Sequence, residues 1–266
     1  MSEHQRPAPL RAPIGRALVT GASRRVGRAT AVELARAGLD LAITYRSDEA
    51  GCRETAALAA DAARAAGFAV APEVLHLDLD DTASVARVAA AVEPRGVDCI
   101  VHNASTYAPT AMGSIAARDF ESCYRAEVVS PALLTQALRG ALGRSRLPAG
   151  AAVVFYSDIY ALGKPRVGFT PYIVAKAAVH ALAEQLTVEL APSVRVHCIA
   201  PGVIAWPDDG APGAVSDEIK RATLARTPLA RAGTPEEAAT LVRFLVLEAS
   251  YLTGVTIRID GGRALR

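Results

Sequence analysis

From residue 15 to the end of the chain, short apolar runs alternate with amphipathic stretches, and this alternation constrains the fold more than any other feature. The runs are rich in β-branched residues and nearly continuously apolar, which is typical of parallel strands covered on both faces. They occupy residues 15–20, 40–45, 73–77, 97–102, 151–157, 194–199 and 255–259. Helices are expected over 26–37, 48–66, 82–93, 118–142, 171–190 and 235–248. This order predicts one doubly wound, Rossmann-type α/β sheet.

The predicted domain runs from residue 13 to residue 266, because no linker separates two cores. Residues 1–12 lack an apolar stretch and belong to a proline-containing start, so we expect a disordered tail rather than a signal peptide. Proline and glycine are dense over 201–213, and only one strand–helix–strand unit follows. We therefore expect a lid loop at about 203–216 rather than a linker.

Charge and cysteine usage exclude several function classes. The 29 basic and 27 acidic residues leave a net charge of +2, which gives no electrostatic case for nucleic acid or a membrane surface. No apolar run approaches the ~20 residues of a membrane span. The four cysteines form neither a CxxC pair nor a cluster with histidine, so no metal site is expected. Buried free thiols in a reducing cytoplasm are the simplest interpretation.

A glycine-containing turn follows the first predicted strand and opens the first helix, reading Thr-Gly-Ala-Ser-Arg-Arg-Val-Gly over 20–27. A dinucleotide pyrophosphate binds in this context, on backbone N–H groups at a helix N-terminus. With only two glycines, a plain β–α turn is the alternative. The candidate cofactor-binding residues are Gly21, Ser23, Arg24, Arg25, Val26 and Gly27.

The second predicted strand ends in Tyr45, Arg46 and Ser47, where a dinucleotide fold meets the adenosine ribose. An acidic residue there would repel a 2′-phosphate, whereas Arg46 offers a forked cation and Ser47 a donor. This predicts a preference for NADPH, the alternative being that Arg46 is simply a solvated surface side chain.

Polar residues also follow later strands. Asn103, Ala104 and Ser105 come after the fourth strand, and Asp158 ends the fifth. Tyr172 and Lys176 are four residues apart on a predicted helix and so share one face. We expect the ammonium of Lys176 to lower the pKa of Tyr172 toward working pH. Such a pair alone is often surface decoration, but all these motifs occur in order in one chain.

Together these motifs resemble the short-chain dehydrogenase/reductase family over residues 15–266. The resemblance adds Asp78 and Leu79 after the third strand, and Pro201 and Gly202 after the sixth, to the cofactor-binding candidates. It implies a seven-stranded parallel sheet, an NAD(P)(H) cofactor and a homotetramer.

Three departures from the general family pattern resemble the pteridine reductase branch. Arg25 replaces the usual middle glycine of the turn, Asp158 replaces the usual catalytic serine, and Tyr107 follows closely after Asn-Ala-Ser. The resemblance implies that an aromatic here stacks a pterin and that an aspartate pairs with the catalytic tyrosine. The implied catalytic residues are Asp158, Tyr172 and Lys176; the implied substrate-binding residues are Arg25, Ser105, Tyr107, Asp158, Tyr172 and Trp206.

The chemistry of these residues agrees with that branch. Tyr107 offers a stacking face for a flat heteroaromatic ring. Asp158, with a pKa raised by a dry pocket, could share a proton with Tyr172 and deliver it to the nitrogen of a reduced C=N bond. The sequence thus favours NADPH-dependent reduction of a dihydropterin or dihydrofolate. Trp206 either closes over the substrate or simply packs.

Two alternatives remain open: a ketoreductase acting on a C=O substrate, and a non-catalytic NADPH-binding regulator. The second is motivated by Glu127, which stands where the family commonly has an asparagine that holds a water linked to the active lysine. Glu127 could bind that water or pair directly with Lys176, so the sequence assigns it no firm role.

Overall fold

The computed structural model describes residues 9–206 and 214–266, and its described strands form one parallel sheet. The order across the sheet is β3-β2-β1-β4-β5-β6-β7. The strands are β1 (Gly15–Val19), β2 (Leu39–Tyr45), β3 (Glu73–His76), β4 (Cys99–His102), β5 (Ala151–Tyr156), β6 (Val194–Pro201) and β7 (Val255–Ile259). The predicted doubly wound, seven-stranded Rossmann-type domain is thereby confirmed.

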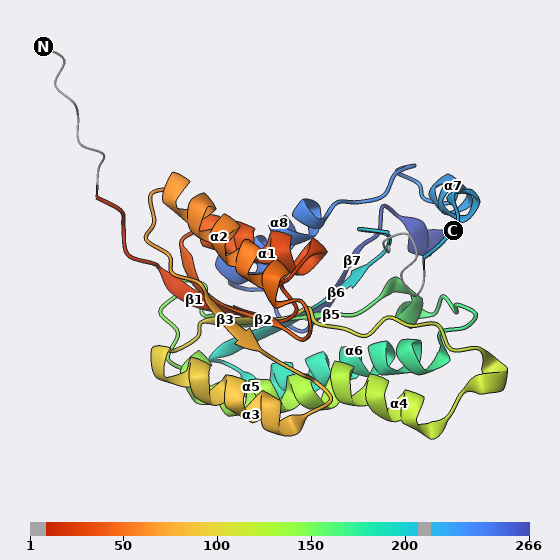
Figure 1. Cartoon of the computed structure of the whole chain (residues 1–266), viewed down its shortest axis with the longest axis horizontal. Coiled ribbons are helices and arrows are strands. Elements are labelled where there is room, and N and C mark those ends of the chain that lie inside the picture. Colours follow the sequence, from red (N-terminus) through yellow and green to blue (C-terminus); the bar gives the residue numbers. More distant parts are fainter. Residues whose placement is uncertain (1–8, 207–213) are drawn as a thin grey trace, which may run out of the picture.

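Helices cover both faces of the sheet (Figure 1). On one face lie α1 (Arg25–Arg36), α2 (Glu49–Ala65) and α8 (Pro235–Leu247). On the other lie α3 (Thr82–Val92), α4 (Ala117–Tyr124), α5 (Ser130–Leu142) and α6 (Thr170–Leu190). Strand order reverses between β1 and β4, and the crevice at the carboxyl ends of strands beside such a reversal is where open α/β sheets bind ligands.

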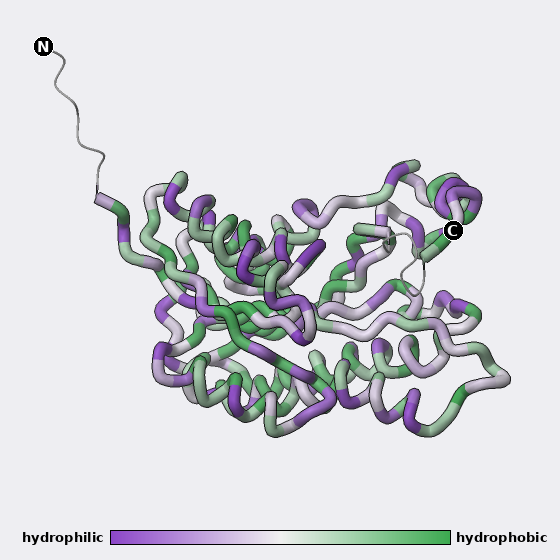
Figure 2. The backbone as a smooth tube through the Cα atoms, viewed as in Figure 1, coloured by the Kyte–Doolittle hydropathy of each residue, from purple (hydrophilic) through white to green (hydrophobic). Residues whose placement is uncertain are grey.

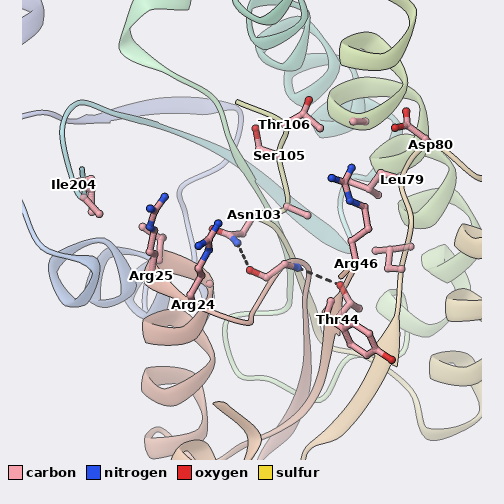
Figure 3. Close-up of a pocket in the computed structure, with 18 of the residues that line it drawn as sticks. Arg24, Arg25, Thr44, Arg46, Leu79, Asp80, Asn103, Ser105, Thr106 and Ile204 are labelled. Atoms are coloured by element: carbon pink, nitrogen blue, oxygen red, sulfur yellow. Dashed lines mark hydrogen bonds between the residues drawn. The ribbon is translucent and has the colours of Figure 1, made fainter. Parts of the chain in front are cut away.

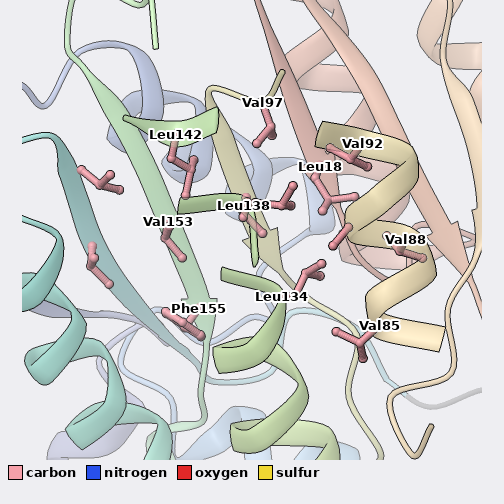
Figure 4. Packing of buried hydrophobic residues seen from close by; sticks show 14 of the residues in the cluster. Leu18, Val85, Val88, Val92, Val97, Leu134, Leu138, Leu142, Val153 and Phe155 are labelled. Carbon is pink, nitrogen blue, oxygen red and sulfur yellow. The ribbon is translucent and has the colours of Figure 1, made fainter. Parts of the chain in front are cut away.

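Each face of the sheet has its own apolar core. Figure 4 shows the face where Leu134, Leu138 and Leu142 of α5 pack with Val85, Val88 and Val92 of α3 against Leu18, Val153 and Phe155 of the strands. Figure 2 shows hydrophobic colour along the central strands. The strands are therefore rigid supports for the residues at their carboxyl ends.

The helix expected over 118–142 is interrupted. Between α4 and α5 a π-helical turn covers Arg125–Val129, and such turns are frequent at functional sites. The structure also contains α7 (Asp217–Ala225), which was not predicted. Its start signals are present, because Ser216 caps it and two acidic residues open its first turn.

The start of the chain differs in part from the expected tail. Residues 1–8 lie outside the described residues, but the backbone of Arg11 bonds to Gly67 and Ala69. Its guanidinium also stacks 4.0 Å from the centre of the Phe68 ring. The disordered tail predicted over 1–12 is therefore wrong at Arg11, because hydrogen bonds to the end of α2, distant in sequence, fix it.

Candidate active site

Two adjoining cavities lie at the carboxyl ends of the strands. The first, of about 420 Å³, holds most of the predicted cofactor-binding residues: Gly21, Arg24, Arg25, Val26, Gly27, Tyr45, Arg46, Leu79, Asn103, Ala104, Ser105 and Gly202. The second, of about 430 Å³, holds Tyr107, Asp158, Tyr172, Pro201 and Trp206. Arg25 and Gly202 line both, so the two cavities meet beside the glycine turn.

The glycine turn is tight enough to require both of its glycines. Gly21 has a φ of +66°, and a Cβ there would lie 2.9 Å from the Cα of Ala104. A Cβ on Gly27 would lie 2.2 Å from the carbonyl oxygen of Gly21. The Asn103 side chain donates to the carbonyl oxygens of Thr20 and Gly21, both at 2.9 Å, and Figure 3 shows the bond to Gly21. Asn103 thus fixes the turn against the end of β4.

The start of α1 fits a phosphate-bearing ligand. No side chain caps this helix and its first turn has no acidic residue, so its first N–H groups are available to an anion. Arg25 adopts a φ of +52°, in the left-handed region that glycine would occupy without strain. Figure 3 shows Arg24 and Arg25 at this helix start and Arg46 at the end of β2. A cationic cleft with exposed amides suits a dinucleotide phosphate.

Several predicted cofactor residues lie elsewhere. The Ser23 hydroxyl is buried and donates to the carbonyl oxygen of Asp48 at 2.7 Å, so it holds the α2 start. Ser47 is exposed and does not line the cleft. Asp78 accepts from the N–H of Asp80 at 3.0 Å, and Asp80 rather than Asp78 lines the cleft.

Tyr172 and Asp158 meet in the second cavity. The Tyr172 hydroxyl donates to Oδ2 of Asp158 at 3.2 Å, while Oδ1 accepts from the N–H of Tyr160 at 2.9 Å. Burial raises the pKa of Asp158 above its ordinary value of 3.8. The buried carboxyl group of Asp158 is therefore more readily protonated than a solvated aspartate.

The pKa of Tyr172 shifts in the direction opposite to our expectation. Burial raises it well above 10, and the nearby carboxylates of Asp158 and Glu127 raise it further. Lys176 is not among the main causes of the shift, and its ammonium lies 5.7 Å from the Tyr172 ring centre and faces Glu127. Tyr172 consequently keeps its proton at neutral pH.

Glu127 forms a direct ion pair with Lys176. The Lys176 Nζ lies 2.7 Å from Oε2 of Glu127 and also donates to the Tyr156 carbonyl oxygen at 2.7 Å. The other Glu127 oxygen accepts from the Ser105 hydroxyl at 2.5 Å and the Thr106 N–H at 3.2 Å. Glu127 is 4% exposed and Lys176 is 2% exposed. Of the two possibilities left open by the sequence, the structure has direct pairing.

Two neighbouring polar residues have structural partners instead. The Ser157 hydroxyl donates to the Lys176 carbonyl oxygen at 2.9 Å and meets His180 at 2.8 Å, so it points to α6 and not to Tyr172. His102 is buried against Phe155 and bonds to Thr135, and burial lowers its pKa to about 3. Both residues anchor strand ends.

Aromatic rings form one wall of the second cavity. Tyr107 meets Tyr172 edge to face with ring centres 5.2 Å apart, and lies 4.8 Å from Phe169. The other charged and ring residues of this wall, Tyr160, Arg166 and Arg263, were not predicted from the sequence, and neither were Val215, Ile219 and Thr223 of the α7 region. They come from segments that only the tertiary fold brings together.

The expected lid loop is described in part. Trp206 lines the second cavity and is partly exposed, while residues 207–213 lie outside the described residues. Within the described residues, no group of histidine, cysteine and acidic side chains is arranged to hold a metal ion. No described helix is long and apolar enough to cross a membrane. The four cysteines are free thiols; three are buried and Cys123 is partly exposed.

Comparison with known proteins gives consistent matches. Residues 21–264 match the family described as Enoyl-(Acyl carrier protein) reductase. The chain is 31% identical over 251 residues to 3-oxoacyl-(acyl-carrier-protein) reductase FabG of Staphylococcus aureus, covering 92% of this chain and 96% of that protein. It is also 31% identical over 262 residues to human dehydrogenase/reductase SDR family member 4, covering 94% and 87%.

Solved structures agree. A short-chain dehydrogenase from Burkholderia cenocepacia in complex with NADP superposes with a TM-score of 0.83 at 27% identity, covering 96% of this chain and 99% of that one. Acetoin dehydrogenase YohF from Salmonella typhimurium gives 0.79 at 27% identity, covering 95% and 98%. With the sheet order and the glycine turn, these matches show that the chain belongs to the short-chain dehydrogenase/reductase family of NAD(P)-dependent oxidoreductases.

Proposed function

We propose that this protein is an NADPH-dependent reductase of a dihydropterin- or dihydrofolate-type substrate. The observation that carries the proposal is the Tyr172–Asp158 hydrogen bond at 3.2 Å, in a cavity that raises the pKa of both groups. A reduced C=N nitrogen needs a proton, and a buried carboxyl group can hold one for it. A serine hydroxyl at this position would orient a carbonyl instead.

The cofactor preference follows from the cationic cleft. Arg46 lines the cleft at the end of β2, where the adenosine ribose would lie, and carries the charge to bind a 2′-phosphate. The resemblance would have Lys176 hold the nicotinamide ribose, but Lys176 is 2% exposed and binds Glu127 and Tyr156, so we assign it the role of holding the Glu127 side chain. When bound, NADPH supplies the hydride.

The proton reaches the substrate from the chain's own residues. Tyr172 stays protonated chiefly because burial disfavours its phenolate, and its hydroxyl donates to Asp158. A proton that Asp158 takes up from solvent passes to a substrate nitrogen, which leaves a carboxylate that accepts a hydrogen bond from the Tyr172 hydroxyl. Tyr107 adds a flat face against which a heteroaromatic ring stacks.

A second candidate is carbonyl reduction, which the names of the relatives favour. The similar proteins include a 3-oxoacyl-(acyl-carrier-protein) reductase and an acetoin dehydrogenase. Carbonyl reduction also fits a protonated Tyr172, but it gives Asp158 no catalytic role.

The decisive assay follows NADPH oxidation with 7,8-dihydrobiopterin and with a ketone panel, using NADH as a control. We expect the unmodified protein to reduce the pterin, and we expect the rate to fall ~10²–10⁴-fold in Asp158→Ala. The matched control is Asp61→Ala, on the exposed side of α2. Undiminished pterin turnover in Asp158→Ala, or turnover of ketones alone, overturns the proposal. Cofactor binding without any turnover supports the regulator.

We also propose the homotetramer that the family resemblance implies. Phe120 and Tyr124 of α4 and Val174 of α6 expose apolar surface around a shallow groove. Light scattering tests the assembly, and a monomer at micromolar concentration would refute it.

A further inference from the structure

We propose that Arg166 and Arg263 form a subsite for an anionic group on the substrate, so that the preferred substrate carries a carboxylate on its side chain. The inference rests on the proposed function for the flat heteroaromatic part of the ligand. It names a substrate class within that function: folate-type molecules with an anionic tail rather than pterins with a neutral side chain.

Aromatic stacking holds both guanidinium groups at the second cavity. The Arg166 guanidinium lies 4.3 Å from the ring centre of Phe169 and 5.2 Å from that of Tyr160. The Arg263 guanidinium lies 5.3 Å from the Tyr160 ring centre and donates to its hydroxyl at 2.6 Å. Tyr160 is thus flanked by two cations.

The end of the chain holds this arrangement together. Lys164 donates to the carbonyl oxygen of Arg263 at 2.7 Å and also to that of Arg266. The last four residues are thereby tied to the segment that carries Tyr160 and Arg166. Two guanidinium groups from distant parts of the sequence are fixed together before any ligand arrives, which lowers the entropic cost of binding one.

The described residues that line this cavity include the guanidinium groups of Arg166 and Arg263 and one carboxylate, that of Asp158. Neither Arg166 nor Arg263 forms an ion pair with a carboxylate of the described residues. Partly buried arginines normally have such partners, and the fork of a guanidinium matches a carboxylate in two parallel hydrogen bonds. A carboxylate on the substrate would be the ion-pair partner of these two arginines.

Arg166 has a second possible role, because its charge also acts on Asp158. It lowers the pKa of that carboxyl group, although less than burial raises it. Arg263 is not among the main causes of the shift in the pKa of Asp158, so its substitution tests the subsite more directly. A counterion role for Arg166 would alter the pH profile with every substrate, whereas an anion subsite alters the choice between substrates.

The test compares kcat/KM for dihydrofolate with kcat/KM for 7,8-dihydrobiopterin, both with NADPH. We expect their ratio to fall about ten- to a hundredfold in Arg263→Gln, the usual value of a charge-assisted contact. Arg263→Lys keeps the positive charge but loses the forked guanidinium, so its ratio should lie between those of the unmodified protein and Arg263→Gln. Arg146→Gln is the control, because Arg146 is exposed near the amino-terminal ends of β4 and β5, and it should leave the ratio unchanged. An equal ratio in Arg263→Gln and the unmodified protein overturns the subsite.

A binding measurement separates this inference from the proposed function. Calorimetry on the NADPH-loaded protein compares 2-naphthoate with 2-naphthamide, two flat ligands that differ in charge. Tighter binding of the carboxylate, lost in Arg263→Gln, supports the subsite even if no pterin is reduced. Equal affinity for the two ligands refutes it even if pterins are reduced. Thermal unfolding of each variant checks that the fold is intact.

Discussion

Removing the charge of Glu127 should destabilise the fold, because it would leave the Lys176 ammonium buried without a counter-charge. At a separation of 2.7 Å the gross attraction of the pair is about 6 kcal/mol at an effective dielectric constant of about 20. Desolvation of two groups that are 4% and 2% exposed offsets much of it. The net contribution of the pair to the free energy of unfolding is therefore small. Removing one partner is costly all the same, because it leaves the other charge buried alone.

We expect Glu127→Gln to lower the free energy of unfolding by about 3–5 kcal/mol, as for other buried pairs that lose one partner. For a chain of this size this lowers Tm by roughly 6–20 °C. Gln keeps an acceptor for the Ser105 hydroxyl and the Thr106 N–H, so lost hydrogen bonds contribute little. Denaturant unfolding and calorimetry measure both quantities.

The matched control is Glu189→Gln on α6, where the carboxylate is exposed and the change should stay within ~0.5 kcal/mol. A double-mutant cycle with Lys176→Met isolates the pair, since removing both charges should cost less than the two single losses combined. Additive losses, or a Glu127→Gln protein as stable as the unmodified one, would refute the buried ion pair.

Four further outcomes are expected. Burial raises the pKa of Asp158, so the folded protein keeps the carboxyl proton to higher pH than the unfolded chain. The free energy of unfolding should therefore fall as the pH rises through the raised pKa. Denaturant unfolding from pH 4 to pH 8 should show a smaller fall in Asp158→Asn. Tyr172 should contribute no tyrosinate absorbance near pH 10, and a difference between the unmodified protein and Tyr172→Phe there would contradict the shift. Arg46→Asp should weaken NADPH binding about ten- to a hundredfold relative to NADH, and a fluorescence titration showing equal use of both cofactors by the unmodified protein would refute the assignment. Gly27→Ala should cost about 1–3 kcal/mol or more and weaken cofactor binding, because its Cβ would lie 2.2 Å from the Gly21 carbonyl oxygen; an unchanged Tm and Kd would contradict this.

The sheet could be predicted from the sequence because parallel strands buried on both faces leave a local signal. Each predicted strand overlaps an observed one, and the boundaries differ by a few residues. The position of Tyr172 and Lys176 on one helix followed from their spacing. By contrast, α7 was not predicted, although Ser216 and the acidic first turn are signals for a helix start. A short helix beside a Pro- and Gly-rich segment has no long apolar periodicity to indicate it.

Electrostatics could not be predicted in the same way, because spacing shows which residues share a face but not where a charge points. Lys176 was expected to act on Tyr172, yet its ammonium faces Glu127 from the π-helical turn between α4 and α5. The same limitation hid Arg263, whose place depends on contacts with residues about a hundred positions earlier in the sequence. Such long-range pairs leave no periodic trace in the sequence.

The raised pKa of Tyr172 bears on which residue gives up a proton during reduction. Donation of its own proton would leave Tyr172 as a phenolate, and burial beside Asp158 and Glu127 disfavours that anion. Asp158, to which the Tyr172 hydroxyl donates, starts from a far lower ordinary pKa and is the better proton donor of the two. The Glu127–Lys176 pair contributes to this bias, because an ammonium neutralised by a carboxylate stabilises a nearby phenolate less than a lone ammonium would. Glu127, which stands where the family commonly has an asparagine, therefore favours Asp158 over Tyr172 as the group that loses a proton.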